Sequence, residues 1–147
     1  MSPIPRPALL LGLAGLLPFL WGALTSVQPG LAEWGSDLLG PRFVGPYVQV
    51  FYGAIILAFM SGVLWGFATK AEGWDAYVLS VIPALWAFFT TGGGAERAAG
   101  ALIVGFIGLL ALDWVFWKRG LAPQWWMGLR VLLTLIVVNA LAVDLIF

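Results

Sequence analysis

Five long apolar segments dominate the chain, and the stretches between them hold most of the charged and turn-forming residues. The segments cover residues 7–27, 47–68, 74–91, 97–117 and 124–146. A helix of about 20 residues crosses a bilayer core that is about 30 Å thick. The pattern therefore predicts an all-α membrane protein, a single transmembrane domain over residues 1–147 that folds as a bundle of five membrane-spanning helices.

The links between these segments differ in length and composition. Residues 28–46 form a long link that is rich in Gly and Pro, whereas the other links are short and force consecutive helices to be antiparallel neighbours. The long link has apolar residues at helical spacing opposite two acidic residues: Leu31, Trp34, Leu38 and Leu39 against Glu33 and Asp37. This pattern fits a short helix in the membrane interface, and it fits an ordinary amphipathic cap equally well.

Basic residues at the segment ends predict the orientation in the membrane. One side holds Arg6, Lys70, Lys118 and Arg119, and the other side holds Arg42 and Arg97. Lys and Arg are enriched in cytoplasmic loops. We therefore expect a multi-pass protein of the bacterial inner (cytoplasmic) membrane, with the N-terminus in the cytoplasm and the C-terminus in the periplasm.

Composition narrows the chemistry that the chain can perform. It has no His and no Cys, 62% hydrophobic residues, 10% charged residues and a net charge of zero. Imidazole and thiolate metal sites and Cys nucleophiles are thereby excluded, and the lack of a basic patch argues against nucleic acid. We expect no metal, no cofactor and no enzymatic activity, since the best catalytic set is Asp113 with Tyr77 or Ser80.

Small residues and prolines predict how the helices pack. Ala54, Ala58, Gly62 and Gly66 are spaced four residues apart and form a groove down one helix, which allows another backbone to approach closely. The groove packs within the bundle or receives a helix from a partner. Pro18 and Pro83 lie inside the first and third segments, where each removes a backbone donor and should kink its helix.

Asp113 and Arg130 form the most suggestive pair of charges. They lie eight residues before and nine residues after residue 121, in the turn between the fourth and fifth helices, and so at nearly the same depth. A charge inside the membrane usually has a partner or a wet cavity. We predict a salt bridge that pins the two helices together, and favour this structural clamp over a role in handling substrate or protons.

Other polar residues in the last helix have simpler expected roles. Asn139 should hydrogen-bond to a neighbouring helix, and Thr134 should bond to the backbone of its own helix. Asp144, near the end of the segment, should meet Arg42 or face water.

Several motifs resemble those of a known family. Tyr52–Leu57 with Ser61–Gly66 resembles the second-helix motif, and Gly120–Pro123, Trp125-Trp126, Leu129-Arg130 and Thr134 resemble the closing motif. The family comprises small bacterial inner-membrane proteins catalogued as domain of unknown function thirty-four twenty-nine, with a mitochondrial transmembrane relative. The resemblance implies several membrane helices and no particular activity. Leu64 stands where His is expected often and Trp126 where Tyr is common, so a polar function centred on that His would be lost here.

Two functions follow from these features as hypotheses. The first is a non-catalytic accessory or assembly subunit that lies in the lipid bilayer and packs against other subunits of a larger respiratory or photosynthetic complex. The alternative is a small carrier or binder of a quinone, a lipid or another apolar molecule. For the alternative, Trp65, Trp86 and Trp114 are the candidate lining of a pocket.

Overall fold

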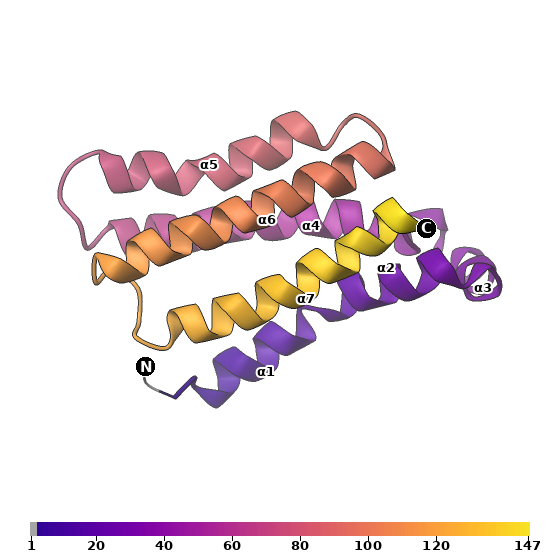
Figure 1. Ribbon diagram of the computed structural model, residues 1–147, viewed down its shortest axis with the longest axis horizontal. Coiled ribbons are helices and arrows are strands. Elements are labelled where there is room, and N and C mark those ends of the chain that lie inside the picture. The colour runs from indigo at the N-terminus through magenta and orange to yellow at the C-terminus, as the bar shows by residue number, and fades with distance from the viewer. Residues whose placement is uncertain (1–2) are drawn as a thin grey trace.

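The computed structural model describes residues 3–147, and its regular elements in that range are all helical. In chain order they are α1 (Arg6–Ala14), α2 (Leu17–Val27), α3 (Pro29–Leu39), the 3₁₀ turn η1 (Pro41–Phe43), α4 (Tyr47–Ala68), α5 (Asp75–Thr90), α6 (Ala95–Lys118) and α7 (Trp126–Ile146). The long helices run back and forth between two ends, and the two termini lie at opposite ends (Figure 1).

Four helical stretches are long and apolar enough to cross a membrane. They are Arg6–Val27, Tyr47–Ala68, Ala95–Lys118 and Trp126–Ile146. Helix α5 is also apolar, but its 16 residues fall short of the length that identifies a span by itself. An all-α membrane protein is thus confirmed, with four clear spans and a fifth, shorter apolar helix.

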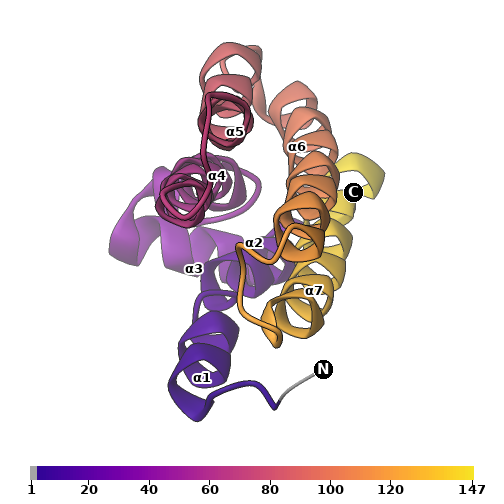
Figure 2. The same cartoon turned by 90° about the vertical axis from the view of Figure 1, so that its left-hand side faces the viewer.

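The first expected span is broken at Gly15 and Leu16. Pro18 has no backbone N–H to donate to the carbonyl of Ala14, so the α-helical ladder stops there and restarts as α2. Leu16 N instead donates to Leu13 O at 3.0 Å. Seen from its end, the bundle shows α1 displaced from α2 (Figure 2). Pro83, by contrast, lies within a continuous α5.

Helices α4 and α6 form the centre of the bundle. Helix α5 packs on both of them, α2 packs between α4 and α7, and α1 packs on α7 (Figure 2). The core is made of fully buried aromatic and aliphatic side chains, among them Phe19, Leu57, Leu102, Phe106 and Phe116. The rings of Phe19 and Phe106 meet edge to face at 5.9 Å between centroids, an arrangement that aromatic pairs favour.

Part of the long link forms helix α3, which is compatible with both of its expected structures, the interfacial helix and the amphipathic cap. Gly35 of α3 is buried, and a Cβ atom there would lie 2.9 Å from the ring of Trp21, so the two helices meet closely. The Trp21 indole N–H donates to Phe43 O at 2.7 Å and holds η1 in place. Trp34 and Leu38 are left exposed on the outer side of α3.

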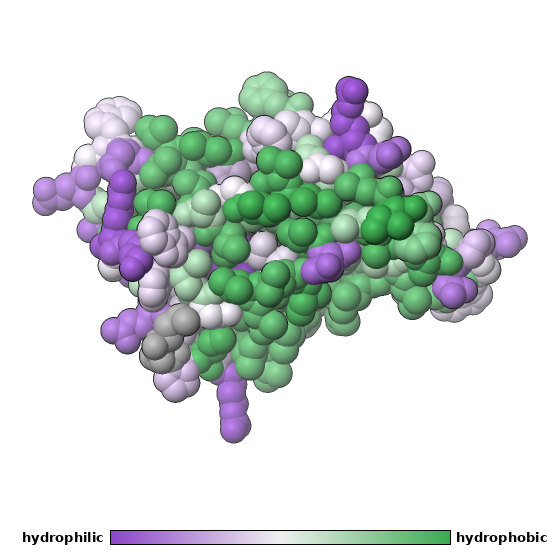
Figure 3. Space-filling model, in the orientation of Figure 1, coloured by the Kyte–Doolittle hydropathy of each residue, from purple (hydrophilic) through white to green (hydrophobic). Residues whose placement is uncertain are grey.

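The surface separates apolar from hydrophilic side chains along the bundle. On the face shown in Figure 3, hydrophobic side chains cover the middle and hydrophilic ones gather mainly toward the ends. At one end, Lys70 Nζ donates to Leu121 O at 3.3 Å, and Arg119 pairs with Asp75 at 2.6 Å. These contacts join the α4–α5 and α6–α7 turns, outside the apolar band.

Candidate functional site

A buried ion pair joins α6 to α7. Arg130 Nε donates to Asp113 Oδ2 at 2.8 Å, and the two side chains are 7% and 0% exposed. The Trp126 indole N–H donates to the other carboxylate oxygen, Oδ1, at 2.9 Å. Both oxygens of the buried carboxylate therefore have a donor, as a charge in an apolar interior requires.

The three groups of this cluster were not equally visible in the sequence. Matching depth along the hairpin brings Asp113 and Arg130 together, whereas Trp126 was not expected to take part. The signal for it was its position four residues before Arg130, which places both side chains on one face of α7. The cluster links α6 to α7 through three side chains that are buried in the bundle.

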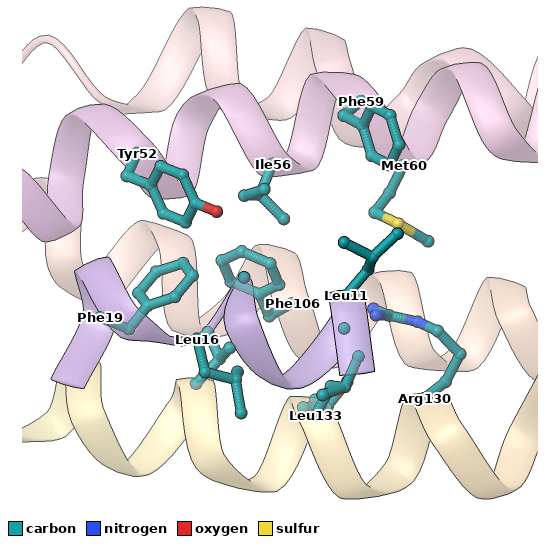
Figure 4. A pocket seen from close by; sticks show the side chains of 14 residues that line it. Leu11, Leu16, Phe19, Tyr52, Ile56, Phe59, Met60, Phe106, Arg130 and Leu133 are labelled. Carbon is teal, nitrogen blue, oxygen red and sulfur yellow. The ribbon is translucent and has the colours of Figure 1, made fainter. Parts of the chain in front are cut away.

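Arg130 contacts Asp113 side-on, through Nε. The planar guanidinium carries five N–H donors, and the described residues provide an acceptor for the one on Nε. Figure 4 shows the guanidinium end of Arg130 reaching into a cavity. The terminal Nη groups thus remain available for another oxygen atom.

The cavity has a volume of about 300 Å³ and lies where α1 and α2 separate. Its walls are mostly apolar, with Leu16 from the break between α1 and α2, Phe19 from α2, Ile56 from α4 and Phe106 from α6. The polar groups at its edge belong to Arg130 and Thr134 of α7 and to Tyr52 of α4. A small apolar chamber with a few converging polar groups is the usual form of a ligand site.

Two polar residues of α7 behave opposite to expectation. Thr134 is buried, but its hydroxyl has no hydrogen-bond partner among the described residues, so the predicted bond to its own helix is wrong. Asn139 is exposed, and its side-chain amide donates to Leu135 O at 2.7 Å within α7, so the predicted bond to a neighbouring helix is wrong. Thr134 is one of the residues that line the cavity.

The polar contacts of Gln49 and Asp144 connect helices far apart in sequence. Gln49 is fully buried in α4, and its amide donates to Ala140 O at 2.8 Å and to Phe19 O at 3.3 Å. Sequence reasoning missed it, although an amide inside an apolar segment was a visible signal. Asp144 accepts a bond from the Ser26 hydroxyl at 2.9 Å, rather than meeting Arg42 or facing water as predicted.

The small-residue groove of α4 faces outward over most of its length. Ala54 is half-buried, whereas Ala58, Gly62 and Gly66 are exposed. A Cβ atom added at Gly62 or Gly66 would meet no heavy atom within 4 Å. At these two glycines the groove therefore does not pack within this bundle, and the second interpretation, an outward groove, fits the geometry.

Trp65, Trp86 and Trp114 do not surround a common cavity. They are 50%, 37% and 50% exposed on α4, α5 and α6. The Trp86 indole N–H donates to Ala101 O at 2.7 Å, and Trp65 stacks edge-on against Tyr77. The expected Trp-lined pocket is corrected accordingly, because smaller side chains already fill the core and the large indoles lie on the outside.

The candidate catalytic set is not assembled either. Both oxygens of Asp113 are occupied by donors from α7. The hydroxyl of Ser80 donates to the backbone carbonyl of Tyr77 at 2.6 Å. The structure thus shows no hydrogen bond between Asp113 and either Tyr77 or Ser80 among the described residues.

The comparisons with known proteins agree with a membrane-embedded fold. The chain is 35% identical over 153 residues to Transmembrane protein 69 of Xenopus tropicalis, covering 99% of this chain and 56% of that protein. It is 31% identical over 150 residues to Transmembrane protein 69 of Mus musculus, covering 97% of this chain and 56% of that protein. The chain thus spans about half the length of these curated relatives. No solved structure matches it significantly.

The similarity to these relatives and the apolar helices together indicate that the chain is an integral, multi-pass membrane protein. The family model described as "Protein of unknown function (DUF3429)" matches residues 4–146, nearly the whole sequence. The chain therefore belongs to the DUF3429 family.

Proposed function

We propose that the protein crosses the bacterial inner membrane five times, with its N-terminus in the cytoplasm and its C-terminus in the periplasm. Helix α5 connects the ends of two clear spans by short turns, and its 16 residues are about 24 Å long. The start of α1 and the ends of α4 and α6 lie toward the same end of the bundle (Figure 1), and these element ends carry or adjoin Arg6, Lys70 and the Lys118-Arg119 pair. This end would face the cytoplasm under the positive-inside rule.

We infer that the protein is a non-catalytic accessory or assembly subunit that packs against a larger membrane complex, respiratory or photosynthetic in kind. One observation carries this proposal, the outward groove at Ala58, Gly62 and Gly66 of α4. Lipid tails are as apolar as Leu, so helices associate in membranes through close packing, which small residues permit. A partner helix would fill the open space above both glycines better than flexible acyl chains.

Native-detergent purification of the tagged protein from its own membranes tests this proposal. Wild type should retain larger membrane subunits in stoichiometric amounts, measured by mass spectrometry. The double variant Gly62→Leu/Gly66→Leu should lose them because the new side chains fill the groove.

The matched control is Gly108→Leu on α6, another exposed glycine with no heavy atom within 4 Å of an added Cβ. It should retain the subunits. Purification of the wild type without stoichiometric partners would refute the accessory role, as would equal retention by the double variant and the control.

A second function, binding of a quinone, a lipid or another apolar molecule, is favoured by a separate observation. The cavity beside Arg130 is lined mostly by apolar side chains and also by the polar groups of Arg130, Thr134 and Tyr52. It replaces the Trp-lined pocket as the candidate site for such a molecule.

A further inference from the structure

Arg130 brings more donors to the cavity than the protein uses. Its Nε–H is bound to Asp113, and the four remaining N–H donors of the guanidinium lie at the end that points into the cavity (Figure 4). These four donors open onto the apolar cavity, where an acceptor would make charge-assisted hydrogen bonds with them. An oxygen atom from outside the protein would satisfy them.

The charges around the cavity select a neutral ligand. Asp113 neutralises Arg130, and its two oxygens are already taken by Arg130 and Trp126. A bound anion would bring an additional buried charge without its own counter-ion, which is costly in a membrane interior. A carbonyl oxygen accepts hydrogen bonds from the guanidinium without adding a charge.

Two hydroxyl groups also line the cavity, one on each of two facing walls. Thr134 is buried, and its Oγ1 lacks a partner among the described residues. Tyr52 lines the opposite side from α4, and its phenol oxygen points inward (Figure 4). Hydroxyl groups can donate as well as accept, so both can bind a carbonyl-type oxygen.

The cavity opens toward the lipid between α1 and α4. Leu11 of α1 and Phe59 of α4 line it and are 75% and 65% exposed. The break before Pro18 separates α1 from α2, and Gly12 and Gly15 contribute no side chain to this wall. A volume of about 300 Å³ is small for a ligand site, so it suits one ring or ester group with its tail in the bilayer.

We propose that this cavity binds the carbonyl-bearing end of a neutral amphiphile, with oxygen atoms on Arg130 and Thr134 at one wall and on Tyr52 at the facing wall, and with its apolar tail leaving between α1 and α4. Quinone rings and lipid esters share this chemistry. The inference rests on the second candidate function and is independent of the accessory role.

Binding to the purified, delipidated full-length protein tests the site. The probes are decylubiquinone and dioleoylglycerol, each titrated by calorimetry in dodecyl maltoside. Thr134→Val and Tyr52→Phe should each raise the dissociation constant about fivefold to tenfold, the effect of one lost hydrogen bond. Thr134→Val should leave the melting temperature of the unliganded protein unchanged or higher, because the hydroxyl has no protein partner.

The matched controls make the same two types of substitution, Thr to Val and Tyr to Phe, on α5 and away from the cavity. Thr90→Val and Tyr77→Phe should leave binding as in the wild type. Loss restricted to decylubiquinone identifies a quinone as the source of the carbonyl group, and loss restricted to dioleoylglycerol identifies a lipid ester. Binding that is insensitive to both cavity variants would overturn this site while leaving a binding function elsewhere, and failure of both probes to bind would overturn both.

Discussion

Breaking the Asp113–Arg130 pair one residue at a time should cost far more stability than removing both charges. Asp113→Asn keeps the shape and an acceptor for Trp126, but leaves the buried Arg130 without its counter-ion. Arg130→Met leaves Asp113 with the Trp126 bond and no cation. Removing one partner of a buried pair costs about 3–5 kcal/mol in known proteins. Because each single variant keeps a hydrogen bond between Trp126 and the side chain at position 113, we expect the lower end of that range, about 3 kcal/mol, for either one.

The double variant Asp113→Asn/Arg130→Met should have a free energy of unfolding within about 1 kcal/mol of the wild-type value, since neither charge of the pair then remains buried. Unfolding by SDS in mixed micelles, followed by fluorescence and circular dichroism, gives the free energies for the cycle. Asp75→Asn is the control, because it breaks the pair with Arg119 whose side chains are 60% and 43% exposed. It should not change stability measurably. Additive losses in the double variant would refute the interpretation of the pair as a mutually dependent clamp.

Four further substitutions test packing, each measured as the free energy of unfolding in the same micelles. Gly22→Ala should lower the free energy of unfolding by about 1–3 kcal/mol because the new methyl group overlaps Gln49. Gly62→Ala should leave it unchanged or raise it by up to about 1 kcal/mol, because the space there is open. Equal effects of the two substitutions would contradict the conclusion that Gly22 is tightly packed and Gly62 is not. Gln49→Leu should lose about 1–2 kcal/mol as its bonds from α4 to α2 and α7 disappear, and an unchanged value would show that they add nothing. Ser61→Ala should lower the free energy of unfolding by about 1 kcal/mol because it removes the acceptor of the Ala84 N–H. Unchanged stability would contradict this and would show that the N–H finds another acceptor in the α5 backbone.

The helices could be predicted from the sequence because each is a long apolar run bounded by charges and turns. The segment predicted over 47–68 is α4 with the same bounds. The effect of Pro18 was expected as a kink, but the chain breaks into two helices there. A missing hydrogen bond at one residue predicts where a helix is weak. How far the two halves of the helix separate there depends on their packing against the neighbouring helices.

The polar site could be predicted in part. Equal depth along a hairpin places Asp113 opposite Arg130, because the rise per residue of a helix is fixed. The direction in which each side chain faces depends on packing between helices distant in sequence. The sequence therefore did not reveal that Thr134 faces a cavity, nor that Trp65 and Trp114 face outward.

A photoreactive amino acid at position 62 of α4, activated in native membranes, would report directly on what covers the outward groove. The same amino acid at position 108 of α6 provides the comparison, because both glycines have open space above them. We predict a discrete adduct with one larger membrane subunit from position 62 and none with that subunit from position 108. Adducts with lipid alone from both positions would contradict the proposal that α4 receives a partner helix.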